Sequence, residues 1–282
     1  MVPNIAISDL LNQPEKNISF WVDRFEDMPE PENLVFPHKH NFYEILWITK
    51  GSSKHTIEYN NYEITADNLF FISPGQLHFL EEWQDIEGYC ILFTEDYFLQ
   101  LFQNKNILFE LSYLDNLYSN PFLKMDEEAK IKLKPTINLL FQEKSNETVQ
   151  AILFVLLKQI QNLFSEKITN QNTKHQIVIF KQFKILVNQN FNKNLALTDY
   201  ANQLNITAHR LNSIVKSVCN KTASDIIKER IILQAKQLLQ FSDNTISEIT
   251  LKLGFEDSSY FARYFKKHNS TSPLEFRKHH LL

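Results

Sequence analysis

The chain has 282 residues, of which 43% are hydrophobic, and it carries a net charge of -4. This composition excludes a disordered chain, and the length suits two domains with packed cores. The longest apolar runs fall far short of the roughly 20 residues that cross a bilayer, and no secretion signal is apparent, so we expect a cytoplasmic protein without a membrane partner. Cys90 and Cys219 lie far apart without a CxxC pattern, which favours small buried residues over a disulfide or a zinc site.

Charge divides the chain into two parts of opposite sign. Residues 1–176 contain 14 Lys and Arg against 25 Asp and Glu, a net charge of -11, whereas residues 177–282 contain 15 against 8, a net charge of +7. A polar string, TNQNTKHQ, ends the acidic part, and we predict a linker there, at 169–176. Only the basic part suits a polyanion such as DNA. The alternative is that both parts are ordinary solvated surfaces.

Residues 18–94 show the alternation of short β-strands. Five stretches are rich in β-branched and aromatic residues: ISFWVDRF, YEILWIT, SKHTIEY, NLFFIS and GYCILF. Turn-like segments such as KGSS and SPGQ separate them, and no helical pattern intervenes. Such a series predicts a β-barrel or sandwich, and we place this domain at residues 1–125.

One segment of this region has the spacing of metal ligands. In PHKHNFYEILWITKG, residues 37–51, His38 and His40 point to the same side of an extended chain, and Glu44 shares that side if no bulge intervenes. HKHNFYEILWITKG together with ISPGQLH at 72–78 resembles the cupin, a small β-barrel whose metal-binding members use a His-x-His-x3-Glu set and a later His. The resemblance implies that His38, His40, Glu44 and His78 share one pocket.

Three interpretations of this pocket follow from its residue types. Three imidazoles and a carboxylate could hold a divalent transition metal with open coordination positions. The same groups could bind a small-molecule effector, or they could form a satisfied structural cluster. Burying four ionisable groups costs free energy unless a ligand, water or ion pairs with them, which favours a functional site. We expect an effector pocket without a cofactor, and a sugar, a carboxylate and an aromatic acid are all compatible with it.

Residues 126–168 predict two helices after the barrel. Apolar residues recur at helical spacing, at Leu133, Ile137, Leu140 and Phe141 and again at Ile152, Val155, Leu156 and Leu163. Pro135 lies in the first segment, so that helix either begins near Pro135 or kinks there. The apolar faces are wider than the barrel alone needs, which favours a dimerisation segment over a helix pair packed only on its own barrel.

The basic part, residues 177–282, contains a repeated helix-turn-helix pattern. LALTDYANQLNITAHRLNSIVKS at 195–217 predicts two short helices around a turn, and TISEITLKLGFEDSSYFARYFKKH at 245–268 repeats the pattern with Gly254 at the turn. Between them, SDIIKERIILQAKQLLQF predicts one long helix. That helix would present both second helices to successive major-groove segments, about 34 Å apart. The alternative is a helical bundle with no role in DNA binding.

The long helix and the second repeat carry a specific signature, IKERIILQAKQLL followed by ISEITLKLGFEDSSYFARYFKKHNSTSPLEFRK. It resembles the signature of the AraC/XylS family of bacterial transcription regulators. The matching positions are Ala235, Leu238, Leu239, Ile246, Ile249, Gly254, Phe255, Phe261, Phe265, Lys266, Pro273 and Arg277. The resemblance covers about the last hundred residues, and the first repeat is the more divergent one.

The resemblance also implies which residues read DNA bases. The family's positions fall on His209, Asn212 and Ser213 in the first recognition helix and on Ser258, Ser259 and Arg263 in the second. Arg263 could donate two parallel hydrogen bonds to guanine, and Asn212 could pair with adenine. Ser213 stands where some family members have arginine, which argues against strong guanine reading by the first helix.

Three lysines extend this prediction to the DNA backbone. Lys216, Lys266 and Lys267 lie at the far ends of the recognition helices. We expect phosphate contacts there, the alternative being solvated helix ends.

Together these patterns predict an α+β multidomain protein. It has a cupin-like β-barrel with a helical dimerisation segment, then an all-α domain with two helix-turn-helix units joined by a long helix. We predict a ligand-responsive, sequence-specific DNA-binding transcription regulator that is not an enzyme. Its expected partners are promoter DNA, a small-molecule effector and a second copy of the chain, with RNA polymerase as a further candidate. The alternatives are a metal-dependent cupin enzyme fused to a DNA-binding domain, and a constitutive DNA-binding protein whose barrel only dimerises.

Overall fold

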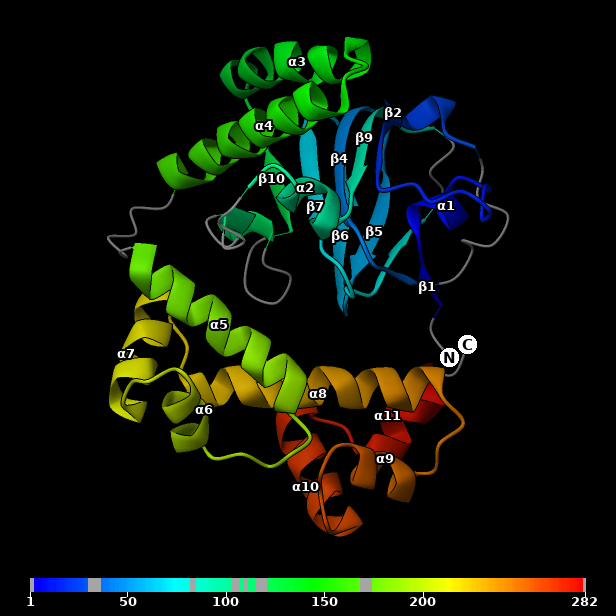
Figure 1. The fold of residues 1–282 in the computed structure, drawn as a ribbon. Helices are drawn as coiled ribbons and strands as arrows, with labels where there is room; N and C mark the ends of the chain where they lie inside the picture. The colour runs from blue at the N-terminus through cyan, green and yellow to red at the C-terminus, as the bar shows by residue number, and fades with distance from the viewer. Residues whose placement is uncertain are drawn as a thin grey trace. The chain divides into compact units, whose positions relative to one another are not determined.

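The computed structural model describes residues 3–29, 37–81, 85–102, 107–108, 111–114, 121–167 and 174–280 (Figure 1). The chain divides near residue 170 into two compact units. The first contains all the described strands, and the described residues of the second form helices and their connections. The predicted combination of a β-rich N-terminal domain and a helical C-terminal domain is confirmed.

Two antiparallel sheets form the centre of the N-terminal unit. The larger sheet has the strand order β10-β7-β4-β9-β2, and the smaller has the order β6-β5-β8. Their strands are β2 Phe20–Arg24, β4 Tyr43–Lys50, β5 Ser53–Ile57, β6 Asn60–Ile64, β7 Asn68–Ile72, β8 His78–Leu80, β9 Glu87–Phe93 and β10 Phe122–Lys124. A short parallel pair joins β1, Asn4–Ile5, to β3, Lys39–His40. Among the described strands no pairing closes these sheets into one barrel, so the cupin-like fold is present as separate sheets.

Strand β4 is buried on both faces, because the two sides of the sheet are covered by different layers. Ile45 and Trp47 pack in a core with residues of α3 and α4. Leu46 and Ile48 alternate to the other side, where they pack with residues of β5 and β6 from the smaller sheet. Glu44 has the same parity as Leu46, so β4 directs it into the space between the sheets.

Helices α3, Glu127–Gln142, and α4, Asn146–Lys167, pack against each other and cover one face of the larger sheet (Figure 1). Asp126 caps α3, because its side chain accepts a 2.9 Å hydrogen bond from the amide of Ala129. The helix therefore begins well before Pro135, and the alternative that it begins near Pro135 is wrong. The cap and the acidic first turn stabilise the amino end, while the buried face holds the helix together through the proline.

Seven helices form the described part of the C-terminal unit. They are α5 Lys174–Asn190, α6 Leu197–Gln203, α7 Ala208–Cys219, α8 Ala223–Phe241, α9 Ile246–Lys252, α10 Ser258–Asn269 and α11 Pro273–His280. The two predicted helix-turn-helix units are α6–α7 and α9–α10, joined by the long helix α8 (Figure 1). Of the predicted linker, residues 169–173 lie outside the described residues, and residues 174–176 belong to α5.

The two units repeat at an interval of about fifty residues, including the caps of their second helices. Thr207 and Asp257 each cap the amino end with a side-chain oxygen. Asn220 and Ser270 each end the helix in the left-handed conformation, with φ values of 56° and 64°. Helices α8 and α11 then begin at the same interval, so the repeated unit comprises three helices.

Gly254 allows the turn of the second unit to approach another backbone segment. Its φ is +80°, and a Cβ atom added there would lie 2.0 Å from the carbonyl oxygen of Asn192, in the segment between α5 and α6. A backbone carbonyl cannot rotate away as the tip of a side chain can. Glycine is therefore required at this turn for both its conformation and its size.

Gly254→Ala should destabilise the C-terminal unit. The left-handed conformation alone costs an alanine about 1–2 kcal/mol, and the contact with Asn192 adds to it, so we expect the melting temperature from far-UV circular dichroism to fall by at least about 4 °C. Tryptophan fluorescence provides an internal reference, because Trp21, Trp47 and Trp83 all belong to the N-terminal unit.

Gly75→Ala is the matched control for this substitution. Gly75 has a φ of +78°, but an added Cβ would meet nothing within 4 Å. It should therefore show the conformational cost alone. A Gly254→Ala protein with an unchanged melting curve would contradict the assigned contact with Asn192.

Candidate functional sites

The four residues predicted for the pocket lie together in the N-terminal unit. His40 ends β3, Glu44 lies in β4 and His78 begins β8. The backbones of His38 and His78 bond to each other in both directions, with N–O distances of 3.0 Å. All four residues are buried, with exposed fractions between 1% and 7%.

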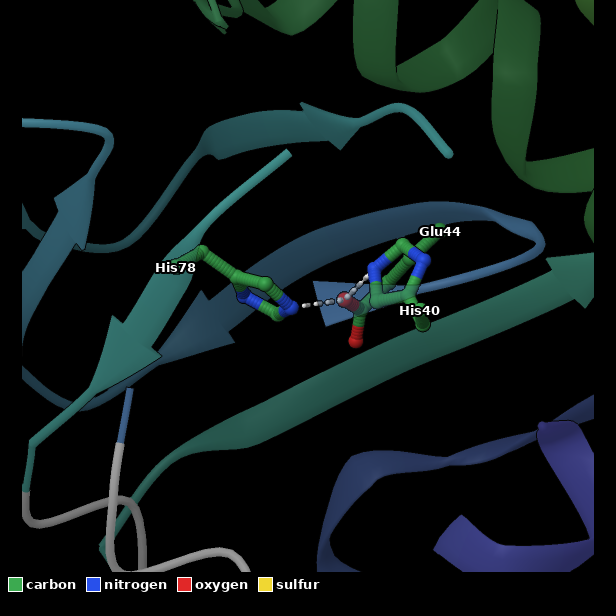
Figure 2. Close-up of side chains that lie close together, drawn as sticks. All are labelled: His40, Glu44 and His78. Carbon is green, nitrogen blue, oxygen red and sulfur yellow. Dashed lines mark ion pairs between the residues drawn. The ribbon is translucent and has the colours of Figure 1, made fainter. Parts of the chain in front are cut away.

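Figure 2 shows the carboxylate of Glu44 between two imidazoles. Its Oε2 atom lies 3.4 Å from Nε2 of His40 and 3.7 Å from Nε2 of His78. The ring of His38 lies beside that of His78, with 4.3 Å between the centroids. The ring of Phe42 stacks on that of His40 at 4.0 Å, which holds that imidazole in its orientation.

A fourth histidine, His55 in β5, belongs to the same cluster, although the sequence analysis did not identify it. Its Nε2 atom lies 3.2 Å from Nδ1 of His78, and its side chain is fully buried. The pairing of β5 with β8 sets Ile57 opposite His78. One signal was available, because His55 shares strand parity with the apolar Ile57 in SKHTI.

The cluster lines a cavity of about 70 Å³. Five of its lining residues are His38, His40, Glu44, His55 and His78. The other lining residues are apolar: Leu10, Phe25, Met28, Pro29, Phe42, Leu46 and Leu80. A mainly apolar wall with a few converging polar groups is the usual composition of a small-molecule site.

Burial and the contacts within the cluster set its charge. Burial alone would raise the pKa of Glu44, but the contact with His40 and the attraction of the surrounding histidines outweigh burial, and the pKa is lowered. Burial lowers the pKa of His55 to about 4 and lowers the pKa of His78 well below its usual value. At neutral pH the cavity therefore holds an ionised carboxylate beside neutral imidazoles at His55 and His78.

In the C-terminal unit, α7 and α10 present matching exposed faces. Each helix buries its inward side, at Leu211, Ile214 and Val215 in α7 and at Phe261 and Phe265 in α10. Equivalent positions are exposed in both helices: His209, Arg210, Ser213, Lys216 and Ser217 in α7, and Ser259, Tyr260, Arg263, Lys266 and Lys267 in α10. Seven of the nine residues predicted to contact DNA lie on these faces, and Arg210, Ser217 and Tyr260 are additional.

The remaining two predicted residues, Asn212 and Ser258, are only half-exposed. Oδ1 of Asn212 accepts a 3.0 Å hydrogen bond from the amide of Ala223, the first residue of α8. Bidentate pairing with adenine would use that same oxygen as an acceptor, and an amide oxygen can accept two hydrogen bonds, so the adenine contact of Asn212 stays a prediction. Asn212 in addition satisfies an amide at the amino end of α8.

The second repeat supports this capping role of Asn212. At the positions equivalent to Asn212 and Ala223 it has Ala262 and Pro273. Proline has no backbone N–H to satisfy and is favoured at the first position of a helix. The unit that needs an acceptor has asparagine, and the unit that needs none has alanine.

Comparison with known families identifies both units. A model of an AraC-like ligand binding domain matches residues 28–167, and a model of a helix-turn-helix domain matches residues 200–279. The chain belongs to the AraC family of transcription regulators. The predicted function of a ligand-responsive, DNA-binding transcription regulator is confirmed at this level.

Three known proteins resemble the chain over most of its length. The HTH-type transcriptional activator RhaR of Enterobacter sp. (strain 638) is 21% identical over 88% of both chains. The uncharacterized HTH-type transcriptional regulator YfiF of Bacillus subtilis (strain 168) is 23% identical over 97% of this chain and 88% of its own. The crystal structure of ToxT from Vibrio cholerae O395 covers 93% of this chain and 98% of its own, with 16% identity and a TM-score of 0.42. RhaR and YfiF are named as a transcriptional activator and a transcriptional regulator. None of the helices described in this chain is long and apolar enough to cross a membrane.

The pocket of this AraC-family chain also has the donor set of a divalent metal site. The ligand atoms of His40, Glu44 and His78 lie within 4.8 Å of one another. Their separations of 3.4 and 3.7 Å from the carboxylate exceed the usual N–H···O distance of about 2.7–3.2 Å. Two ligands about 2.1 Å from one metal lie roughly 3.0–3.4 Å apart, so small movements would fit these three to an ion. Imidazole and carboxylate together suit zinc, iron or manganese.

The buried histidines should make the N-terminal unit less stable in mild acid. The pKa of His55 is about 4 in the folded chain and about 6.5 in an unfolded one. Between these values the unfolded chain binds a proton that the folded chain excludes. The stabilisation is therefore complete above pH 6.5 and is lost as the pH falls toward 4, by about 3 kcal/mol at most from this group.

Urea denaturation followed by tryptophan fluorescence between pH 8 and pH 5 measures this effect. His55→Gln removes the titrating group and should flatten the pH dependence of the free energy of unfolding. Since the pKa of His78 is also lowered, part of the dependence should remain. Identical slopes in the wild type and the variant would show that His55 does not contribute.

Substitution of Asn212 should reveal its capping role. Asn212→Ala leaves the amide of Ala223 without its acceptor, so we expect the C-terminal unit to lose about 0.5–2 kcal/mol in urea denaturation followed by circular dichroism. Adding Ala223→Pro removes that amide, as Pro273 does in the second repeat, and should recover most of the loss. A variant that keeps its stability but binds different DNA sequences would contradict the capping role and support the adenine contact.

Proposed function

We propose that this AraC-family regulator binds a small neutral polyhydroxylated effector, such as a sugar or a polyol, in the cavity around Glu44. Binding there would control the contact of α7 and α10 with promoter DNA. The observation that carries the proposal is an ionised, buried carboxylate surrounded by histidines in a cavity with otherwise apolar walls.

Unsatisfied polar atoms support a ligand in this cavity. Nδ1 of His40, Nδ1 of His55 and Nε2 of His78 are buried and have no hydrogen-bond partner within the described ranges. Each such atom costs about 1–3 kcal/mol when it is left unpaired. Hydroxyl groups both donate and accept, so a polyol could pair with these nitrogens in either tautomer.

The charge of the cavity favours a polyol over an acid. Glu44 is ionised, whereas His55 and His78 are neutral at pH 7. A carboxylate ligand would therefore lie beside the ionised carboxylate of Glu44, and the two like charges would repel each other in a site with little water. A hydroxyl donates to the same carboxylate, and the rings of Phe25 and Phe42 offer apolar surface to the C–H face of a sugar. The cavity volume of about 70 Å³ restricts the effector to a small molecule.

A divalent transition metal is the second candidate occupant. The distances from the carboxylate of Glu44 to the imidazoles of His40 and His78 are longer than those of usual hydrogen bonds, and small movements would fit the three groups to an ion. If a metal binds, it would be held by these three residues and would act as a Lewis acid toward an effector oxygen. The two candidates differ in their response to a chelator.

Dimerisation through α3 and α4 completes the proposal. Four large apolar side chains on these helices are more than a third exposed: Ile131, Leu139, Phe141 and Val155. Exposed apolar groups of this size favour a partner. A second copy of the chain offers the same residues, so a two-fold contact would be self-complementary.

Neutral sugars or polyols should raise the melting temperature of the N-terminal unit. An effector at 100 times its dissociation constant adds about 2.7 kcal/mol to the stability of the folded state. A thermal-shift screen would compare three groups of compounds: neutral monosaccharides and polyols, small carboxylates, and zinc, iron and manganese salts with and without chelator. We expect a response to the first group that persists in chelator.

Two variants test whether the response comes from this cavity. Glu44→Gln should weaken it by removing the carboxylate that accepts from the ligand hydroxyls, while Lys54→Ala, an exposed substitution on β5, is the matched control and should respond as the wild type does. Stabilisation by metals alone would replace the polyol with the second candidate. Stabilisation by none of these compounds would overturn the proposed sensing role.

Charges on the exposed apolar face of α3 should separate the proposed dimer. Ile131 and Leu139 are 71% and 51% exposed, so Ile131→Glu with Leu139→Glu should leave the fold intact and prevent the contact. Sedimentation equilibrium would measure the molecular mass. Lys134→Glu, on an exposed position of the same helix, is the control and should remain dimeric. A wild-type monomer at all concentrations would contradict this part of the proposal.

A further inference from the structure

The two recognition helices carry one arginine each, at positions that are not equivalent. Arg263 is the sixth residue of α10, where α7 has Ser213. Arg210 is the third residue of α7, where α10 has Tyr260. We infer that Arg210 reads a guanine from the first recognition helix and thereby takes the role that Ser213 cannot perform. This inference rests on the proposed DNA contact of α7 and α10.

The partners of the arginines distinguish these two from the rest of the chain. The sequence has five arginines, and three of them bond to other residues: Arg24 to Glu26, Arg230 to Asn188 and Gln234, and Arg277 to the carbonyls of Leu239 and Asn244. The side chains of Arg210 and Arg263 are exposed, and neither has a hydrogen bond or an ion pair in the part of the chain that the structure describes. The two arginines with free guanidinium groups therefore lie one on each recognition helix.

The stability of α7 does not explain an arginine at this position. Arg210 lies in the first turn, at the positive end of the helix dipole, where a cation is disfavoured. Helices α6, α8, α9 and α11 each have an acidic residue in their first turn, whereas α7 has none. A positive amino end with an added arginine suits contact with a polyanion.

The surroundings of Arg210 favour a base contact over a phosphate contact. Residues near the amino end of a recognition helix reach the base edges in the major groove. Ser213 and Ser217 follow Arg210 on the same exposed face, and their short side chains leave room for the longer guanidinium. Lys216 lies farther along α7, where a phosphate contact is expected. The planar guanidinium can donate two parallel hydrogen bonds to O6 and N7 of guanine.

The equivalent position in α10 has a different role. The ring of Tyr260 packs near those of Phe255 and Tyr264, with centroid distances of 5.9 and 6.5 Å. The two arginines are thus offset by three residues between the repeats, or about 4.5 Å along the helix axis. Consequently the two half-sites should each contain a specified guanine but should not be direct repeats of one another.

In vitro selection with the full chain tests the inference. Duplexes with a randomised segment of about 25 base pairs cover two successive major-groove segments. Wild type, Arg210→Ala, Arg210→Lys, Arg263→Ala and Lys216→Ala would be compared at one salt concentration, after circular dichroism has shown equal folding. Affinities for the wild-type consensus and for scrambled DNA would then be measured for each protein.

We expect Arg210→Ala to lose the preference for guanine at one position and to keep the other preferences. Its affinity for the consensus should fall about 5- to 150-fold relative to scrambled DNA. Arg210→Lys should retain affinity for scrambled DNA but lose the same base preference, since lysine cannot form the bidentate pair. Arg263→Ala should lose a different position, and Lys216→Ala should weaken all sequences equally.

Two results would overturn the inference while leaving the proposed DNA binding intact. The first is an unchanged consensus with a uniform loss of affinity in Arg210→Ala, which would assign Arg210 to a phosphate. The second is an unchanged consensus with no loss of affinity, which would leave Arg210 without any contact. Failure of the wild type to enrich any sequence would instead overturn the proposed sequence-specific DNA binding, and the inference with it.

Discussion

The buried charge of Glu44 is the constraint on which the N-terminal unit depends. An ionised carboxylate away from water needs donors or a cation, and here the nearest groups are His40 and His78. Each imidazole has a second nitrogen that also needs a hydrogen-bond partner. The second nitrogen of His78 finds one in His55, and the remaining nitrogens of the cluster need partners in the cavity. Apolar neighbours such as Phe42 cannot satisfy it. The cluster is therefore complete only when something in the cavity offers hydrogen bonds or positive charge.

The alternation of β4 links this requirement to the helical layer. Glu44 and Leu46 face the cavity, while Ile45 and Trp47 on the same strand face the core that contains residues of α3 and α4. Protein cores are close-packed, so a strand buried on both faces cannot shift on one side without repacking the other. A ligand that draws Glu44 toward the cavity would therefore change the packing under the helices proposed to dimerise. Strand β4 would therefore couple the cavity directly to the packing of α3 and α4, without other elements between them.

Features with a local sequence signal were the predictable ones. The strand alternation that groups His38, His40 and Glu44 and the pattern of each helix-turn-helix unit are visible within short segments, and the opposite charges of the two parts need only a residue count. His55 was missed because its contact with His78 depends on the pairing of β5 with β8, which alternation alone does not specify. For the helix around Pro135, only the alternative that it begins at the proline was wrong, because the cap at Asp126 and a buried face outweighed a strong local helix breaker.

The two repeated units show at which positions the role of a residue is the same in both repeats and at which positions it differs. At the start of the third helix the two repeats reach the same result with different residues. In the first, Asn212 accepts from the amide of Ala223. In the second, Pro273 has no amide hydrogen, and Ala262 replaces the asparagine. Positions on the exposed face have no such partner inside the chain, so their chemistry is free to diverge. Arginine occurs at different places on the two faces, and the capping requirement is the same in both. If only the exposed residues of α7 and α10 differ, the two repeats can keep one fold and still contact two different DNA sequences.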